Sequence, residues 1–202
     1  MTLQLPSPDF SALTLPVADV DPNRLFRMSR HNSGEPYFGK SGLNRFDDPR
    51  STLPENQRYG TGYFGFTLEC AFAETVLHDR VAVRGTFPLP DSELGRWVVK
   101  FQGDLLQLAV LTGTHLKRLG GEGALSTTMP YDLPQAWSLA VYTHPASVDG
   151  FVYMSRHQND QQAVVLFDRA KAKLRAVPKK YTAFRDYPGA LEVLRNFGVQ
   201  PY

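Results

Sequence analysis

The sequence lacks several features that would assign it at once to a large class of proteins. Its 202 residues include a single cysteine, Cys70, which excludes an internal disulfide framework and favours a reducing compartment. No uninterrupted apolar stretch approaches the roughly 18 residues that a membrane-spanning helix needs. The N-terminus carries no basic region followed by an apolar run, as a secretory signal would. We therefore expect a cytoplasmic protein with no membrane association.

An excess of charge of one sign is also missing. The formal net charge is +2, and no block of Lys and Arg stands out. A balanced charge of this kind argues against direct contact with nucleic acid. The five histidines form no pair at i, i+4 with a third ligand nearby, so we predict no metal site.

The elements that remain predict one domain, residues 23–202, behind an extended arm, residues 1–22. Strands are predicted from alternation and from β-branched and aromatic content, and helices from capping residues and apolar periodicity. The predicted strands are residues 24–29, 63–66, 80–89, 96–102, 150–155 and 163–169, and the predicted helices are residues 68–79, 104–113, 131–145 and 187–198. This order lacks the regular βα alternation of a doubly wound sheet. We expect an α+β fold with a curved, largely antiparallel sheet.

One predicted helix carries a carboxylate among apolar side chains. Glu74 follows the apolar residues 71–73 and precedes Val76. A glutamate on a helix usually lies on the solvated face, but on a helical wheel Glu74 falls on the inner side. A carboxylate there must pair or serve a ligand, because burying it alone is very costly. Cys70 on the same helix could be a nucleophile, but its apolar surroundings favour a small core residue.

Four further residues stand where core packing and turn formation do not account for them. Arg27 lies inside a strand otherwise suited to burial, and Arg45 follows a glycine-containing loop. Tyr63 lies in a strand, and Ser155 ends a strand that enters a polar turn. Each has an ordinary interpretation: a surface ion pair for the arginines, a core ring for the tyrosine and a turn hydroxyl for the serine.

Taken together, three stretches resemble the RES domain family, which is named after its Arg, Glu and Ser. They are NRFDDP, YGTGYFGFTLECAFAETVLHD and GFVYMSRHQNDQQAVVLFDR. Arg45 matches the arginine of the family, Glu74 its glutamate and Ser155 its serine. Tyr63 matches the strand tyrosine, 11 residues before the glutamate, and Arg27 resembles a further arginine on the first strand. The stretch NRFDDP differs from the Gly-Arg-Trp-Asn motif that is commoner in the family.

The resemblance implies an ADP-ribosyltransferase-like fold and an enzyme that consumes NAD⁺ by hydrolysis, phosphorolysis or transfer of ADP-ribose. It also implies the toxin half of a RES–Xre pair, held inactive by a helix-turn-helix antitoxin. No metal is implied.

The residue types suit this chemistry. Glu74 would stabilise the cationic ribose, and Arg45 and Arg27 would bind the pyrophosphate. Tyr63 would stack on the nicotinamide, with Tyr37 or Phe38 as weaker candidates, and Ser155 would hold Glu74 or a ribose hydroxyl.

The acceptor of the ADP-ribose stays open at this point. A protein-modifying enzyme often has a second acidic residue two positions before the catalytic one, and Phe72 occupies that position here. We therefore favour NAD⁺ degradation over modification of a protein side chain. A module that keeps the fold and binds a nucleotide without turnover is a further alternative.

Overall fold

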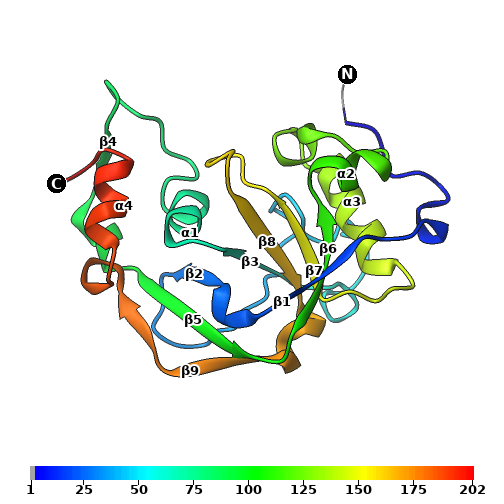
Figure 1. Cartoon of the computed structure of the whole chain (residues 1–202), viewed down its shortest axis with the longest axis horizontal. Helices are drawn as coiled ribbons and strands as arrows, with labels where there is room; N and C mark the ends of the chain where they lie inside the picture. Colours follow the sequence, from blue (N-terminus) through cyan, green and yellow to red (C-terminus); the bar gives the residue numbers. More distant parts are fainter. Residues whose placement is uncertain (1–2) are drawn as a thin grey trace.

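Eight strands form one curled sheet that frames the molecule (Figure 1). The computed structural model describes residues 3–202, apart from the side chains of residues 176 and 178–180. The strands are β1 (Val17–Val20), β2 (Phe26–Ser29), β3 (Thr61–Gly65), β5 (Trp97–Gly103), β6 (Leu106–Leu111), β7 (Gly150–Met154), β8 (Gln162–Phe167) and β9 (Leu174–Ala183). Their order across the sheet is β1-β6-β7-β8-β3-β2-β5-β9. β6 and β7 run parallel and the other neighbours run antiparallel, which confirms the predicted α+β fold.

Of the helices in the described residues, one packs on inner strands of the sheet and the others lie toward its two ends. The helices are α1 (Leu68–Thr75), α2 (Gly113–Arg118), α3 (Asp132–Thr143) and α4 (Ala190–Asn196). In Figure 1, α2 and α3 lie beside β6, whereas α4 lies at the opposite end beside β4 (Phe87–Leu89). β4 pairs in parallel with β10 (Val199–Pro201) to form a second, two-stranded sheet. None of the helices in the described part of the chain is long and apolar enough to cross a membrane.

The prediction of a helix over residues 104–113 is wrong, because most of this segment forms the strand β6. Its apolar run is too short for periodicity to separate a buried strand from a buried helix. Backbone hydrogen bonds stabilise the strand rather than the helix. β6 pairs with β1 on one edge and β7 on the other, so its backbone groups are satisfied in the sheet. A helix, α2, begins where the predicted helix would end.

Of the strand predicted over residues 80–89, only the last three residues form a strand, β4. Arg84 and Gly85 have φ angles of 51° and 79°, and the N–H and C=O groups of Val83 and Thr86 bond across them. Two consecutive positive φ angles define a tight hairpin turn of type I′, which an extended strand cannot contain. β9, the longest strand, is not predicted at all, and α1 ends at Thr75 rather than at residue 79.

The described part of the N-terminal arm contributes to the sheet. β1 pairs antiparallel with β6 and forms one edge. The division of the chain at residue 22 stays a prediction.

Candidate active site

A cavity of about 480 Å³ brings together side chains that lie far apart in the sequence. Arg27 comes from β2, Arg45 from the following loop, Tyr63 from β3 and Glu74 from α1, and all four line this cavity. Its remaining walls are Met28, Leu43, Asn44, Phe46, Thr75, His78, Asp79, Ser126, Tyr131, Tyr153 and Arg156. A concave site of this volume lies within the roughly 300–1,000 Å³ typical of small-molecule pockets.

The Glu74 carboxylate is held by two hydroxyl groups from β7 and the residue that follows it. Ser155 Oγ donates to Glu74 Oε1 at 2.5 Å, and Tyr153 OH donates to Oε2 at 3.2 Å. The start of α1 is fixed as predicted, because the Thr67 hydroxyl accepts a hydrogen bond from the Cys70 N–H at 3.1 Å. A carboxylate has about four acceptor positions, so each Glu74 oxygen can still accept a hydrogen bond from a ligand.

The Ser155 hydroxyl is oriented by the turn after β7. Its oxygen accepts hydrogen bonds from the backbone N–H groups of His157 at 3.2 Å and Gln158 at 3.0 Å. Its own proton is therefore directed at Glu74. The sequence analysis does not single out Tyr153, although a usable signal exists: it stands two residues before Ser155 and so lies on the same face of the strand.

Cys70 lies close to this carboxylate but is not exposed. It is fully buried, and its Sγ lies 3.6 Å from the carbonyl oxygen of Gln162. Burial raises the pKa of the thiol to about 12, and the negative charge of Glu74 adds to the effect. The interpretation of Cys70 as a core residue is confirmed.

Arg45 presents part of its guanidinium to the cavity without a protein partner. Nη1 donates to the carbonyl oxygen of Thr128 at 2.7 Å, and the guanidinium carbon lies 4.7 Å from the ring centroid of Tyr131. The residue is 9% exposed, and its Nη2 is buried with no hydrogen-bond partner among the described residues. Burial lowers the pKa of Arg45, and the positive charge of Arg156 lowers it further. An unpaired N–H donor in such a place is suited to an anionic ligand.

Asp47 fixes the loop that carries Arg45. Its carboxylate accepts hydrogen bonds from Ser41 Oγ at 2.8 Å, from Asn44 N–H at 3.2 Å and Nδ2 at 3.0 Å, and from Thr61 Oγ1 at 2.5 Å. Tyr63 OH approaches it at 3.5 Å. Asp47 is fully buried and joins the loop to β3, so it determines where Arg45 and Tyr63 lie relative to each other.

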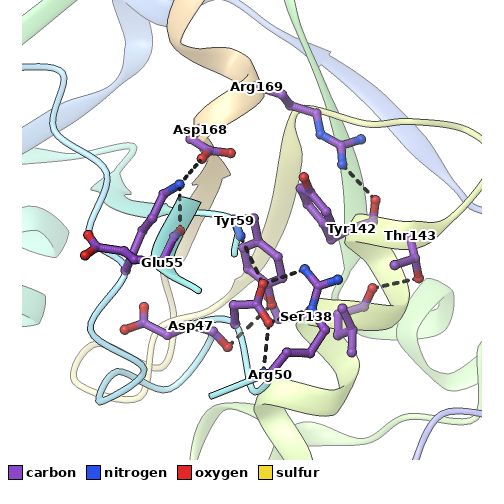
Figure 2. A network of polar contacts seen from close by, with 12 residues as sticks. Asp47, Arg50, Glu55, Tyr59, Ser138, Tyr142, Thr143, Asp168 and Arg169 are labelled. Carbon is purple, nitrogen blue, oxygen red and sulfur yellow. Dashed lines mark hydrogen bonds and ion pairs between the residues drawn. The ribbon is translucent and has the colours of Figure 1, made fainter. Parts of the chain in front are cut away.

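Asp48 and Tyr59 anchor the far side of the same loop. Figure 2 shows Tyr59 beside Ser138. Tyr59 OH donates to Ser138 Oγ of α3 at 3.0 Å, and its N–H donates to Asp48 Oδ2 at 2.9 Å. Burial alone would raise the pKa of Asp48, but the hydrogen bonds from Arg50 and from the Tyr59 N–H hold it below its usual value. The loop is thereby tied both to β3 and to α3.

Arg27 lines the cavity but already has protein partners. Its Nε lies 3.1 Å from Glu35 Oε1, and its Nη1 donates to the carbonyl oxygen of Tyr37 at 2.7 Å. Burial lowers the pKa of Arg27, against the opposing effect of Glu35. The two weaker aromatic candidates do not line the cavity: Tyr37 is 61% exposed, and Phe38 packs against the core behind the sheet.

His78, Asp79 and Arg156 also line the cavity, with His157 beside them, and the sequence analysis assigns none of these residues to the site. His78 follows α1, four residues after Glu74, and its Nδ1 lies 2.7 Å from Asp79 Oδ1. Its ring lies 4.9 Å from that of His157, between centroids, and His157 accepts a hydrogen bond from Arg156 Nε at 2.8 Å. The i, i+4 spacing from Glu74 is the signal that could have identified His78. No group of three or more His, Cys, Asp and Glu in the described part of the chain could hold a metal ion.

The fold and the cavity define an α+β protein with a curled sheet, in which the fixed Glu74 carboxylate and an Arg45 guanidinium with one donor unpaired among the described residues line one cavity. Residues 22–188 match the family model of the RES domain, and the chain belongs to this family. Its fold is similar to a chain in the crystal structure of the M. tuberculosis MbcT–MbcA toxin–antitoxin complex. The two are 11% identical, with 84% of this chain and 87% of that chain covered and a TM-score of 0.58. No curated protein matches the sequence.

Proposed function

We propose that the cavity binds NAD⁺ and that Glu74 promotes cleavage of the bond between nicotinamide and ribose. One observation carries the proposal: the carboxylate held by Ser155 and Tyr153 shares a cavity with Arg45, whose Nη2 has no partner in the described structure. A ligand with a cationic reacting centre and a negatively charged diphosphate satisfies both groups at once. Membership of the RES domain family supports the same substrate.

The reaction needs few protein groups. Departure of neutral nicotinamide leaves positive charge on the ribose ring, and no general acid is required for the leaving group. An ionised carboxylate beside the anomeric carbon stabilises this oxocarbenium-like state, as carboxylates do in glycosidases. Glu74 would accept the ribose 2′-hydroxyl proton in a hydrogen bond while Ser155 and Tyr153 keep the carboxylate in place.

The rest of the dinucleotide is bound by charge and by flat surfaces. Arg45 provides a permanent positive charge for the pyrophosphate, with Arg27 contributing from β2. Tyr63 is our candidate for stacking on the nicotinamide. Its hydroxyl accepts a hydrogen bond from the Phe46 N–H at 3.1 Å, so the ring has a defined orientation at the cavity wall.

The acceptor is proposed to be water or phosphate rather than a protein. Position 72, where a second carboxylate would assist transfer to a side chain, holds a fully buried Phe72 stacked on Phe184 at 4.8 Å between centroids. An acidic residue there would be buried without a partner. With water the products are nicotinamide, ADP-ribose and a proton; with phosphate they are nicotinamide and a phosphorylated ADP-ribose.

We further propose that the protein is a cytoplasmic toxin neutralised by a helix-turn-helix antitoxin. The support is the shared fold with a chain of a toxin–antitoxin complex. Expression of the chain alone should arrest growth and deplete cellular NAD⁺. Co-expression of a helix-turn-helix protein encoded beside it should restore growth, and failure of such a neighbour to do so would remove the antitoxin from the proposal.

The enzymatic proposal is tested by following NAD⁺ and nicotinamide with the purified protein, with and without added phosphate. Glu74→Gln keeps the shape and removes the charge, and should lower turnover by about 10²–10³-fold, the range for losing one preorganised electrostatic contact. Arg45→Ala should lower turnover as well. The matched control is Glu192→Gln, which removes an exposed carboxylate on α4 and should have no effect.

Other outcomes of the same assay identify the alternatives. Full turnover by Glu74→Gln and Arg45→Ala would remove the proposed site. ADP-ribose found on proteins of a lysate, with little free ADP-ribose, would indicate a transferase. NAD⁺ binding with no release of nicotinamide would indicate a non-catalytic nucleotide-binding module.

A further inference from the structure

We propose that Arg156, held in place by the neutral ring of His157, forms with Arg45 a phosphate-binding subsite in the cavity. The inference deepens the proposed function: the phosphate belongs either to the dinucleotide or to a free phosphate that acts as acceptor. The two sources share the same chemistry, and the experiment below separates them.

Arg156 is positioned by its neighbour in the chain. Its Nε–H donates to His157 Nε2 at 2.8 Å, while the side chain lines the cavity. Arginine cannot accept a hydrogen bond and keeps its protons, so Nε2 of His157 must carry the lone pair. His157 is therefore the neutral tautomer with its proton on Nδ1. This contact fixes the guanidinium plane, and no hydrogen bond or ion pair among the described side chains uses the two Nη groups.

The positive charges of Arg45 and Arg156 act on each other in the cavity. Arg156 is close enough to Arg45 that its charge lowers the pKa of Arg45, second only to burial. Neither arginine forms an ion pair within the described residues. Glu74 accepts from Ser155 and Tyr153, and its charge raises the pKa of Arg45 by less than Arg156 lowers it. Asp79 lies 2.7 Å from His78 Nδ1.

Two guanidinium groups that line one cavity create a positive potential that a phosphate group would neutralise. Each can bind phosphate oxygens through parallel N–H groups. One of the donors, Arg45 Nη2, is buried and unpaired within the described chain, so it can donate a hydrogen bond to a phosphate oxygen. Arg27 differs from both, because Glu35 already neutralises it at 3.1 Å. Arg156 is therefore a stronger candidate than Arg27 for the second phosphate contact.

The anchor should depend on pH through His157. Arg156, Glu74, His78 and Asp79 are the charged or titratable groups that act on its ring. Burial lowers the pKa of His157, so the neutral form prevails at neutral pH. As the pH falls below the ordinary histidine value of about 6.5, Nε2 gains a proton and the ring gains a charge that faces Arg156. The hydrogen bond is then lost, and phosphate binding should weaken.

The test measures binding of ADP-ribose and of inorganic phosphate by calorimetry, which does not require turnover. At pH 7.5, Arg156→Gln should weaken one of these ligands by about tenfold or more, the effect of losing a charge-assisted hydrogen bond. A weaker ADP-ribose complex identifies the dinucleotide as the source of the phosphate. A weaker phosphate complex with unchanged ADP-ribose affinity identifies the free acceptor. With NAD⁺ as substrate, KM for the affected ligand should rise by more than kcat falls.

Two substitutions of His157 separate positioning from general structural damage. His157→Leu removes the acceptor and should weaken binding about as much as Arg156→Gln. His157→Gln offers an amide oxygen to Arg156 and should restore the affinity while abolishing its decline between pH 7.5 and 5.5. Arg195→Gln, which removes an exposed arginine on α4, is the charge-matched control and should bind as the wild type does. Thermal unfolding verifies that each variant is folded.

The result that overturns the inference is wild-type affinity for both ligands in Arg156→Gln and His157→Leu. It is distinguishable from failure of the proposed function. Binding of ADP-ribose that depends on Arg156 without any NAD⁺ turnover would uphold the subsite and reject the enzyme. NAD⁺ turnover that depends on Glu74, together with ligand binding that does not depend on Arg156, would uphold the enzyme and reject the subsite.

Discussion

The buried carboxylate of Asp47 should determine both the stability of the loop that carries Arg45 and the activity of the site. Asp47→Ala removes an acceptor that four neighbouring residues use. Two of them, Ser41 and Asn44, are exposed, so water can replace the carboxylate for their donors. The Thr61 hydroxyl is buried and bonds to Asp47 at 2.5 Å, so it would be left without a partner in a closed space.

The magnitude follows from these contacts. Leaving one buried donor unpaired costs about 1–3 kcal/mol, and losing the other hydrogen bonds adds about 0.5–1.5 kcal/mol after replacement by water. We expect the free energy of unfolding to fall by about 2–4 kcal/mol. For a chain of this size each kcal/mol lowers Tm by about 2–4 °C, so the midpoint should drop by roughly 4–16 °C.

The assay combines urea unfolding with NAD⁺ turnover measured well below the new midpoint. Turnover should fall by more than the folded fraction does, because Arg45 and Tyr63 lose their common anchor. Asp47→Asn keeps the shape and one acceptor oxygen, and should have an intermediate effect. Asp186→Ala removes an exposed carboxylate and is the control. A variant Asp47→Ala that unfolds within 0.5 kcal/mol of the wild type, roughly the range of neutral surface changes, and turns over normally would refute the reasoning.

Three further predictions concern the surroundings of Glu74. Ser155→Ala removes a charge-assisted hydrogen bond worth about 1.5–3 kcal/mol and should lower kcat by about 10–100-fold; an unchanged kcat would show that the hydroxyl does not position the carboxylate. Gly65→Ala would bring its Cβ to 2.6 Å from the backbone N of Ala71, so it should lower the unfolding free energy by about 1–3 kcal/mol, whereas Gly123→Ala, with nothing within 4 Å, should be neutral in the same denaturation experiment. Cys70 should resist alkylation at pH 8 in the folded protein, because a pKa of about 12 leaves about one thiolate in 10⁴, and rapid labelling seen by mass spectrometry without denaturant would contradict its burial.

Local patterns in the sequence were enough to predict the elements whose signals are strong. Thr67 begins α1 as its capping type suggests, and the β-branched runs in residues 96–102, 150–155 and 163–169 form strands. The position of Glu74 among apolar residues correctly indicated that its carboxylate has partners on the inner side. These predictions succeed because capping, strand propensity and the cost of burying charge act within a few residues.

Elements and contacts that depend on residues distant in the sequence could not be predicted. β6 reads equally well as a helix until β1 and β7 satisfy its backbone on both edges. β9 contains a proline and two adjacent lysines, and it forms because β5 offers it a long pairing edge with a shift in register between Val99 and Phe101. The partner of Arg27, Glu35, lies in a loop whose course no local pattern predicts.

The order of strands explains why one cavity collects these groups. β8 lies between β3 and β7 in the sheet. The helix that follows β3, α1, therefore ends close to the end of β7, where Glu74 contacts Ser155. Gly65 ends β3 and lets the backbone of α1 approach the sheet closely, since any Cβ there would collide with the helix. The last turn of α1 then sets Glu74 against Ser155, and the turn after Ser155 places Arg156 in the same cavity as Arg45, where it adds a second positive charge. Glu74 and Ser155 therefore meet because of strand order and one glycine, whereas the loop held by Asp47 places Arg45. A change that moves α1 should displace Glu74 from both of these groups.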